Sequence, residues 1–129
     1  MTEEQRLVRA FHDRFLRDNR QTPALRDEGM LDLRVRLLEE ETREFAEAAR
    51  SRDLVEMADA LADVLYVILG TANVLGIDLE PIFKEVHRSN MTKRSPGNTP
   101  AKAVKGEDWS PPDIRAELLR QGWKPNAPA

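Results

Sequence analysis

Acidic side chains at helical spacing are the residues of this chain that are best placed to do chemistry. Glu40, Glu41 and Glu44 stand within a predicted helix over residues 30–50. At about 100° per residue, Glu41 and Glu44 fall inside the apolar arc of that helix, and Glu40 falls at its border. The charged residues that share the opposite arc form an ordinary solvated face. The first group of acids is thus predicted to lie off that solvated face.

A second group of acids lies in the next predicted helix, which begins after Asp53 and ends at Gly76. Between residues 54 and 69 this helix is apolar on nearly all sides, which is typical of a buried helix. Glu56, Asp59 and Asp63 nevertheless share an arc of about 60° on its wheel. A single acidic stripe on a buried helix must face a group that compensates its negative charge.

A divalent cation is the compensating group that these carboxylates fit best. Several ionised carboxylates in one pocket repel one another, and burial of even one without a counter-charge is costly. The second of the two helices carries no basic residue after Arg52. Mg²⁺ takes oxygen ligands and is usually held by a few carboxylates together with substrate phosphates, and Mn²⁺ fits similarly. The alternative is a solvated acidic cluster or an oligomer interface, because Glu-x-x-Glu pairs are common on exposed helices.

The elements that must position these acids are all predicted to be helical, so the expected fold class is all-α. Apolar residues recur with a helical period through most of the chain, and Asp53 and Asp78 are predicted N-caps. A run rich in proline and glycine, without periodicity, indicates a long coil over residues 91–112, and such a coil is often functional. The predicted helices cover residues 3–16, 30–50, 54–75, 79–90 and 113–121.

Composition and charge exclude several other classes of protein. The chain has 129 residues, of which 40% are hydrophobic and 33% charged, and this fits one helix-rich globular domain. The absence of cysteine excludes disulfides, cysteine-ligated zinc and thiol catalysis. Residues 1–90 carry 19 acidic and 13 basic side chains, whereas residues 91–129 carry 4 acidic and 7 basic. An acidic body with a short basic segment suits a metal-bound anionic ligand better than nucleic acid.

Neither a membrane span nor a secretory leader is expected from the sequence. The apolar run of residues 57–75 is interrupted by Asp59 and Asp63, whereas a span needs about 20 apolar residues with few charges. The first nine residues lack the apolar segment of a secretion signal. Together with the absence of cysteine, these features predict a cytoplasmic protein that does not bind membranes.

The order and spacing of the acids resemble a known signature. Glu40-Glu41-x-x-Glu44, eleven further residues and then Glu56-x-x-Asp59 are similar to the EExxE…ExxD pattern of the all-α nucleoside triphosphate pyrophosphohydrolase superfamily. That superfamily includes MazG proteins, dimeric dUTPases and phosphoribosyl-ATP pyrophosphohydrolase. The resemblance covers residues 31–114. Further segments that look like the MazG-like branch are residues 61–67 (LADVLYV), 76–79 (GIDL) and 86–93 (VHRSNMTK), and Lys105-Gly106 before Pro111-Pro112.

This resemblance implies a single domain over residues 1–129 with the MazG fold, which is like a four-helix bundle and assembles as a dimer. Its core would cover residues 30–94, followed by the C-terminal coil and short helix of residues 95–121. The resemblance also implies that Mg²⁺, or Mn²⁺ in its place, holds the triphosphate of a nucleotide substrate. The implied enzyme cleaves the bond between the α- and β-phosphates to give a nucleoside monophosphate and pyrophosphate. A frequent role is the removal of unwanted nucleotides, with dUTP as one well-known substrate.

From the resemblance we assign expected roles to individual acids. Glu41 is expected to bind metal and also to orient or deprotonate the attacking water. Glu40 is expected to bind a second ion or to hold another ligand in place. Asp63 can share the metal-facing role, because it continues the stripe that begins at Glu56. The remaining expected metal ligands are Glu44, Glu56 and Asp59.

The substrate is expected to meet a different part of the chain. No Walker-type glycine loop is present in the sequence, so the phosphates are expected to contact Lys93, together with Arg94 or Lys105. Asn90 continues the apolar stripe of its helix, and its amide can read a base or sugar edge. A plain helix C-terminal cap is an equally good interpretation of Asn90.

Two alternatives to this function remain open at the level of sequence. The first is another enzyme of the same superfamily, which acts on phosphoribosyl-ATP. The second is a non-catalytic helical dimer that binds nucleotide or metal as a sensor. The full set of acids argues against the second alternative, because an interaction module does not need several acids off its solvated faces.

Overall fold

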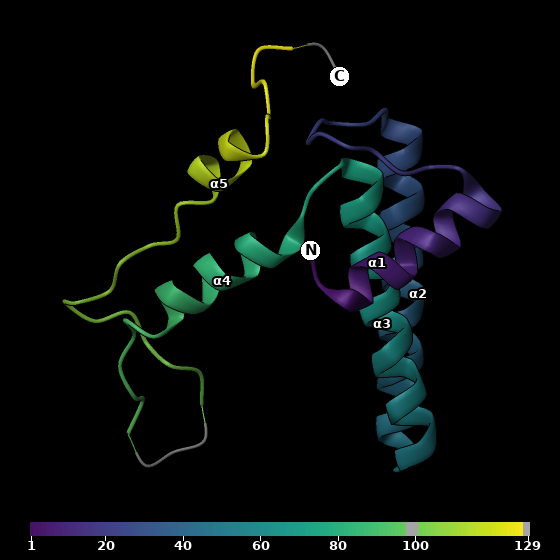
Figure 1. Ribbon diagram of the computed structural model, residues 1–129. Helices are drawn as coiled ribbons and strands as arrows, with labels where there is room; N and C mark the ends of the chain where they lie inside the picture. Colours follow the sequence, from purple (N-terminus) through teal and green to yellow (C-terminus); the bar gives the residue numbers. More distant parts are fainter. Residues whose placement is uncertain (98–100, 128–129) are drawn as a thin grey trace.

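The computed structural model describes residues 1–97 and 101–127, and every regular element in that part of the chain is a helix (Figure 1). This confirms the predicted all-α fold class. The bounds agree with the predicted ones to within two residues, and the predicted coil, of which residues 98–100 lie outside the described part, separates the last two helices. The helices are α1 (Glu3–Phe11), η1 (His12–Leu16), α2 (Glu28–Arg50), α3 (Leu54–Leu75), α4 (Leu79–Asn90) and α5 (Ile114–Arg120).

Short polar side chains start the helices, as the sequence predicts for two of them. The Asp53 carboxylate accepts a hydrogen bond from the backbone N–H of Glu56, and Asp78 accepts one from Glu80, so both are N-caps. Asp27 caps α2 in the same way. At the other end of α3, Gly76 adopts a left-handed conformation with φ of 73°, which only glycine takes up at little cost.

The first predicted helix consists of two segments with different geometry. Residues 3–11 form an α-helix, but residues 12–16 widen into one turn of π-helix that ends at Arg17, whose φ is 52°. Apolar periodicity does not distinguish the two forms over such a short stretch, so the sequence predicts one continuous helix. The wider turn places His12 in the interior, where only 2% of its surface is exposed.

The helices form two parts that diverge from the end of α3. We call α1, η1, α2 and α3 the body: α2 and α3 form a long hairpin, and α1 packs on α3. The chain then turns by 115° into α4, and α5 packs back against α4 rather than against the hairpin (Figure 1). We call α4, the coil and α5 the arm. Within one chain, α4 therefore does not complete a bundle with α2 and α3.

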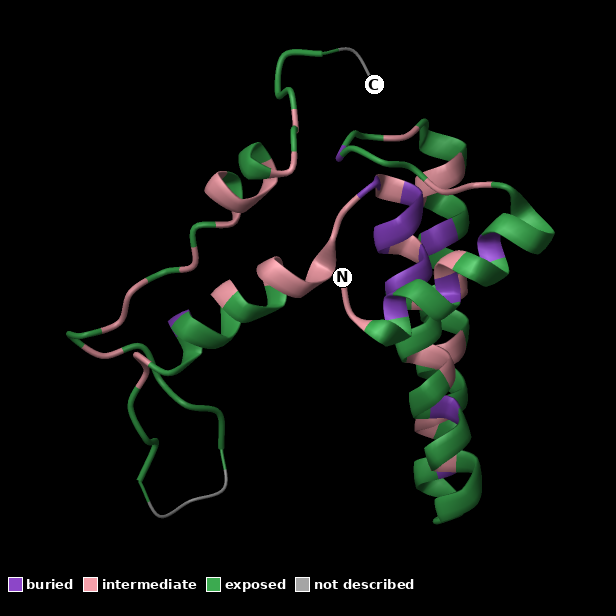
Figure 2. Cartoon of the chain, viewed as in Figure 1, coloured by how far each residue is buried: buried purple, intermediate pink, exposed green. Residues whose placement is uncertain are grey.

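The buried apolar residues are few, and most lie where α1 crosses the hairpin (Figure 2). The sequence predicts that α3 is a buried helix, and in a single chain this is wrong for its first half. Leu54 and Val55 are 77% and 78% exposed, and Leu61 is 55% exposed. The prediction fails because α4, which would cover this face in a bundle, points away. The buried apolar side chains are Val8, Ala48, Ala60, Leu69, Ala72 and Val74.

A charged side chain occupies the centre of the body. Arg34 of α2 is only 7% exposed, and its guanidinium donates hydrogen bonds to Thr71 Oγ1 at 3.0 Å and to the Val67 carbonyl at 3.1 Å. The ring of His12 lies beside it, with Nδ1 3.2 Å from the Asp18 carbonyl. Both side chains pass over Gly70, where the lack of a Cβ leaves room for them.

Among the described residues, no single helix is both long enough and apolar enough to cross a membrane. Taken together, α3 and α4 reach that length and apolar composition, but they form a pair bent by 115°.

Candidate metal centre

The α2–α3 hairpin determines which acids can meet. Its connection is short, with residues 51–53 between the two helices, and Arg52 takes up a left-handed φ of 54° there. The two helices run antiparallel, so residues equally far from the connection lie opposite each other. Glu41 on α2 is therefore opposite Asp63 on α3, and Glu44 lies one turn from Glu41 on the same face.

Three carboxylates form a compact group, which we call the carboxylate cluster. One oxygen each of Glu41, Glu44 and Asp63 lies within 4.8 Å of the other two. Glu41 and Asp63 are half-buried, whereas Glu44 is exposed. Oε2 of Glu41 is buried and has no hydrogen-bond partner among the described residues. An unpartnered buried carboxylate oxygen is rare in proteins, because it loses its hydration without a replacement.

The electrostatics of the cluster are those of acids held close together without a counter-charge. Burial, followed by the neighbouring Glu44 and Asp63 carboxylates, raises the pKa of Glu41 above its ordinary value of 4.5. Glu40 adds a smaller repulsion to the same group. A cation placed among these oxygens would reverse the repulsion, since it favours the ionised form of each acid.

The donor set fits a hard divalent cation. All three ligands are carboxylate oxygens, which Mg²⁺ and Mn²⁺ prefer. Oxygens that share one Mg²⁺ at about 2.1 Å lie about 3 Å apart when adjacent and about 4.2 Å apart when opposite. The three oxygens lie within 4.8 Å of one another, so at most a small rotation, available to the exposed Glu44 side chain, would bring them to these spacings. Within the cluster, Glu41 Oε2 is a buried oxygen that lacks a hydrogen-bond partner among the described residues.

The other predicted metal ligands lie outside this group. Glu56 and Asp59 precede Asp63 on α3 by two turns and one turn, and both are exposed, as is Glu40 on α2. The sequence predicts that Glu56 and Asp59 are turned inward, as is Glu44, with Glu40 at the border of the apolar arc. In the single chain that prediction is wrong for Glu44, Glu56 and Asp59, which are exposed because no described helix covers the hairpin there. Their roles as ligands stay predictions.

Asp63 is the residue whose place in the cluster the sequence indicated least clearly. The EExxE…ExxD spacing assigns the second half of the signature to Glu56 and Asp59, and Asp63 enters only as a continuation of their stripe. The signal that identifies it is its distance from the helix connection, which matches that of Glu41.

The predicted substrate-binding residues belong to the arm and not to the hairpin. Asn90 is the exposed last residue of α4, and Lys93 follows it. Arg94 pairs with Val104 through two backbone hydrogen bonds of 2.9 and 3.0 Å, which close the loop between them. Nζ of Lys105 lies 4.3 Å from the centroid of the Trp109 ring.

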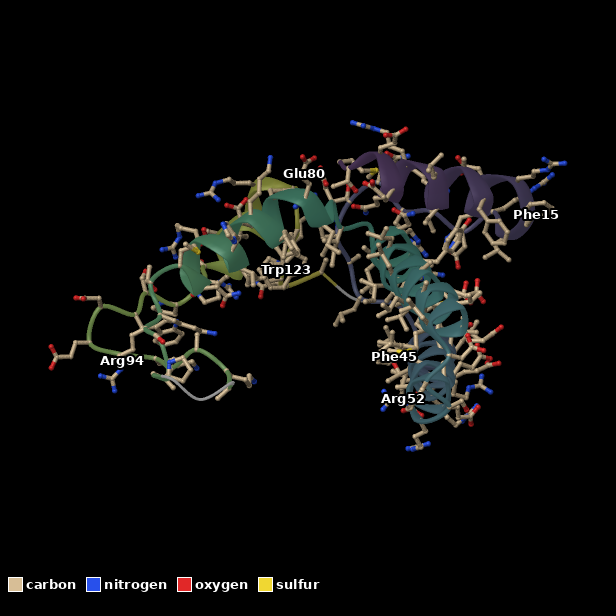
Figure 3. The ribbon with its side chains drawn as sticks, turned by 90° about the horizontal axis from the view of Figure 1, so that it is seen from below. Phe15, Phe45, Arg52, Glu80, Arg94 and Trp123 are labelled. Carbon is tan, nitrogen blue, oxygen red and sulfur yellow. The ribbon has the colours of Figure 1, made fainter. Side chains whose placement is uncertain are left out.

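The cluster and the basic residues therefore lie on different parts of the chain. Figure 3 shows Arg94 at the far end of the arm, and Phe45 and Arg52 on the hairpin, with the bend of the chain between them. Within one chain, the structure does not bring Asn90, Lys93, Arg94 or Lys105 to the carboxylate cluster.

Comparison with known proteins identifies the family of this chain. The model of a protein family described as phosphoribosyl-ATP pyrophosphohydrolase matches residues 5–90. The chain belongs to that family. The phosphoribosyl-ATP pyrophosphohydrolase family is part of the MazG-like all-α nucleoside triphosphate pyrophosphohydrolase superfamily, which confirms the resemblance found in the sequence.

The family match extends from the first turns of α1 to the last residue of α4. It includes all three residues of the carboxylate cluster and Asn90. Lys93, Arg94 and Lys105 follow the matched residues, as do the coil and α5.

A curated relative matches a shorter part of the chain. An uncharacterized protein of Acanthamoeba polyphaga mimivirus is 42% identical to this chain over 48 residues, which are 37% of this chain and 19% of that protein. The matched part is thus about a fifth of the length of that relative.

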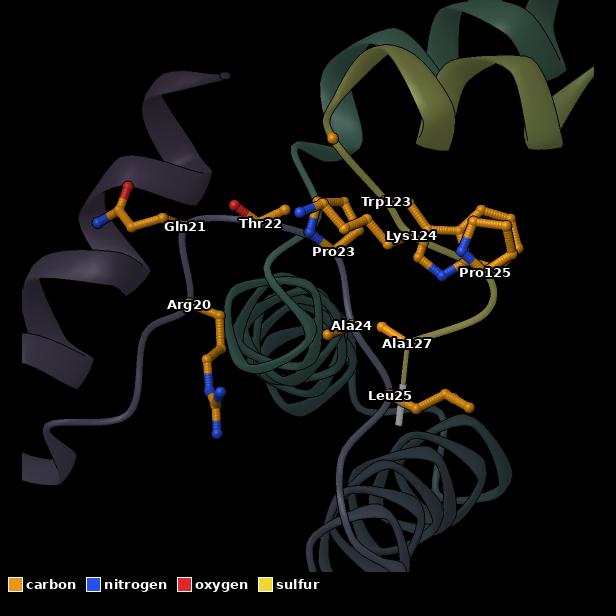
Figure 4. A pocket seen from close by; sticks show the side chains of 11 residues that line it. Arg20, Gln21, Thr22, Pro23, Ala24, Leu25, Trp123, Lys124, Pro125 and Ala127 are labelled. Atoms are coloured by element: carbon orange, nitrogen blue, oxygen red, sulfur yellow. The ribbon is translucent and has the colours of Figure 1, made fainter. Parts of the chain in front are cut away.

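A cavity of about 420 Å³ lies away from the cluster, between the segment that follows η1 and the C-terminal segment (Figure 4). Pro23, Leu25 and Trp123 are among its lining residues. None of the predicted site residues lines it.

Proposed function

We propose that this protein is a Mg²⁺-dependent nucleotide pyrophosphohydrolase. Its reaction would hydrolyse the bond between the α- and β-phosphates of a nucleoside triphosphate to give the monophosphate and pyrophosphate, as a means of removing unwanted nucleotides. The observation that carries the proposal is the carboxylate cluster of Glu41, Glu44 and Asp63, held within 4.8 Å on a hairpin that the family match covers.

The chain's own residues would divide the work as follows. Glu44 and Asp63 hold the cation from two different helices, so the rigid hairpin fixes its position. Glu41 orients the attacking water through its buried carboxylate and accepts its proton, while a phosphorus–oxygen bond breaks and pyrophosphate leaves. When bound, Mg²⁺ supplies neutralisation of the phosphate charge and lowers the pKa of a coordinated water. Glu40, Glu56 and Asp59 are then available for a second ion.

The substrate is proposed at the level of a nucleotide with an α–β phosphoanhydride. Such a bond occurs in dUTP and other nucleoside triphosphates and also in phosphoribosyl-ATP, which the description of the matched family names. Lys93, Arg94 and Lys105 are proposed to bind the phosphates, and Asn90 the base or sugar. Arginine and lysine are the usual phosphate ligands of proteins that lack a glycine-rich loop.

A homodimer is proposed as the active form, because a single chain leaves both the apolar surface and the site incomplete. Phe83 of α4 is 70% exposed, and Leu54 and Val55 of α3 are 77% and 78% exposed, although monomeric proteins rarely leave large apolar patches uncovered. In a pair of chains, the arm of one can bring its basic residues to the carboxylate cluster of the other. Size-exclusion chromatography with light scattering tests the pairing, and a monomer at micromolar concentration would contradict it.

The decisive experiment is turnover of a nucleotide panel that includes dUTP, the other nucleoside triphosphates and phosphoribosyl-ATP, with Mg²⁺ and with Mn²⁺. We expect the monophosphate and pyrophosphate as products, and no diphosphate. Glu44→Gln should lose activity, whereas Glu47→Gln, an exposed acid one turn further along α2, should retain it. Nucleotide binding without turnover in the unmodified protein would instead support the sensor alternative.

A further inference from the structure

The connection between α3 and α4 is too short to satisfy its own polar groups. Only Gly76, Ile77 and Asp78 separate the two helices, and the chain bends by 115° across them. The last carbonyls of α3 and the first N–H groups of α4 lack partners within their helices. Some of these groups are satisfied nearby, since the Ile77 N–H donates to the Ala72 carbonyl and Asp78 caps α4, whereas others are satisfied by side chains from elsewhere in the chain.

Gln5 of α1 supplies both kinds of group from the interior. Its side chain is fully buried, with 0% of the residue exposed. Its Nε2 donates to the Ile77 carbonyl at 2.7 Å and to Asn73 Oδ1 at 3.0 Å, and its Oε1 accepts from the Leu79 N–H at 3.0 Å. One amide therefore bonds to the end of α3, to the connection and to the first residue of α4.

Asn73 holds Gln5 in this position. It is 1% exposed, and its Nδ2 donates back to the Gln5 carbonyl at 3.3 Å. The Asn73 carbonyl in turn accepts from the Arg20 N–H at 2.9 Å, which ties the segment after η1 to the same place. The amide of Gln5 is thus fixed by the body and cannot follow α4 if α4 turns.

A second glutamine does the equivalent for the arm. Gln121, which ends α5, accepts from the Asp78 N–H at 2.8 Å and donates to the Asp78 carbonyl at 2.9 Å. At the start of α5, the Asp113 N–H donates a hydrogen bond to the Glu85 carboxylate of α4 at 3.0 Å, and Arg88 donates to the same carboxylate. Because both ends of α5 are tied in this way to α4 and its N-cap, we expect α4 and α5 to move together about the connection.

We propose that Gln5 is a positioning residue: its buried amide fixes the direction in which α4 leaves α3, and so sets where the basic residues of the arm lie. Removal of the amide would leave the Leu79 N–H and the Ile77 carbonyl without partners and release the arm as a rigid body. The consequence for nucleotide binding rests on the proposed function, whereas the consequence for the direction of the arm does not.

The direction of the arm can be measured without any substrate. The chain has no cysteine, so Arg50→Cys on α2 and His87→Cys on α4, both exposed positions, give a clean pair of spin labels. Labelled protein is diluted with unlabelled protein so that only distances within one chain contribute. In the labelled protein that retains Gln5, we expect one narrow distribution of distances between the two labels. In the labelled protein with Gln5→Met, which keeps the side-chain length but not the amide, we expect a broadened or shifted distribution.

A matched control is Gln21→Met, because Gln21 is exposed and, among the described residues, its side chain forms no hydrogen bond to the connection. It should leave the distribution unchanged. If Gln5→Met does not fold, Gln5→Asn, which withdraws the amide by one methylene, is measured in its place. In the unmodified protein the Leu79 amide proton should exchange slowly with solvent. An unchanged distribution in a folded Gln5 variant, or rapid exchange at Leu79, would overturn the proposal.

Enzyme kinetics distinguish the positioning role of Gln5 from the catalytic function proposed for the protein. With a nucleotide that the unmodified protein turns over, Gln5→Met should raise KM about tenfold and change kcat less, because substrate-binding residues are misplaced while the carboxylate cluster is not. Metal binding should stay unchanged, as judged by the rise in Tm with Mn²⁺. If the unmodified protein has no turnover, the proposed function fails, and the distance measurement still decides the role of Gln5.

Discussion

The carboxylates of Glu41 and Asp63 come from different helices of the hairpin, and yet they lie within 4.8 Å of each other. Glu44 completes the group, and burial with this crowding raises the pKa of Glu41. Two consequences can be measured. The cluster should bind a divalent cation, and without one it should destabilise the fold.

Metal affinity should depend on the three clustered acids more than on the rest of the signature. Asp63→Asn removes one charged ligand, and we expect the dissociation constant for Mn²⁺ to rise at least about tenfold. Titration calorimetry or the electron paramagnetic resonance signal of unbound Mn²⁺ measures this change.

The matched comparison is Asp59→Asn, one turn earlier on α3, which is exposed and lies outside the cluster. It should weaken the binding of the first ion much less than Asp63→Asn does. If Asp59→Asn weakens Mn²⁺ binding more than Asp63→Asn does, then Asp59, the last residue of the ExxD pattern, is the principal ligand on α3.

Glu41→Gln should stabilise the metal-free protein at neutral pH while weakening its response to metal. A carboxyl whose pKa is raised by folding contributes stability below its ordinary pKa of 4.5, and that stability is lost as the pH rises through the folded value. At pH 7 the ionised Glu41 therefore costs stability, and the neutral amide does not. Thermal unfolding with and without Mg²⁺ measures both effects, with Glu47→Gln as control. A lower Tm for metal-free Glu41→Gln would contradict the prediction.

The stability of the protein should fall on mild acidification because of His12. Burial lowers the pKa of His12 below its ordinary value of 6.5, and the Arg34 charge acts in the same direction. As the pH falls below about 6.5, the unfolded chain takes up a proton that the folded one resists, so the free energy of unfolding decreases until the folded pKa is reached.

Urea unfolding across pH 5–8 measures this dependence. His12→Gln should flatten it, whereas His87→Gln, at the exposed second histidine of the chain, should leave it as it is. Equal slopes in all three proteins would show that another group is responsible.

Gly70→Ala should destabilise the body even though alanine favours helices. An exchange of glycine for alanine within a helix ordinarily gains about 1 kcal/mol. Here the new Cβ would lie 2.7 Å from Arg34 Nη2 and 2.8 Å from His12 Nε2. Both side chains are buried and cannot move aside freely, and overpacking of this kind costs about 1–3 kcal/mol.

Denaturant unfolding shows whether Gly70→Ala lowers or raises the free energy of unfolding. The exposed Gly29 in the first turn of α2 serves as control, because Gly29→Ala should leave the free energy of unfolding unchanged or raise it. A more stable Gly70→Ala variant would show that Arg34 and His12 can be displaced without loss.

The sequence predicts the helices well because their signals are local. Asp53, Asp78 and Gly76 mark ends by side-chain and backbone chemistry that acts within one turn, and the structure has caps at all three. The π-turn after Phe11 has no such mark, so it could not be predicted.

The packing of the helices against one another was harder to predict from the sequence, because it depends on contacts between residues far apart in the chain. The direction of α4 is set by Gln5 and Gln121, which are 72 and 43 residues distant from their partners Ile77 and Asp78. Helical wheels placed Glu41 and Glu44 on one face of α2, where the structure has them, but they could not show that α4 leaves that face and the acidic stripe of α3 uncovered.

The sparse interior of the hairpin has a consequence for how the protein behaves on dilution. The clustered acids lie in the part of α2 and α3 where neighbouring apolar side chains such as Leu61 and Leu65 are 55% and 47% exposed. In the proposed homodimer, the second chain would cover these side chains and stabilise that segment. Catalysis per chain should therefore decline once the protein concentration drops below the dissociation constant of the proposed dimer, even though α1 and the part of the hairpin that it contacts stay folded.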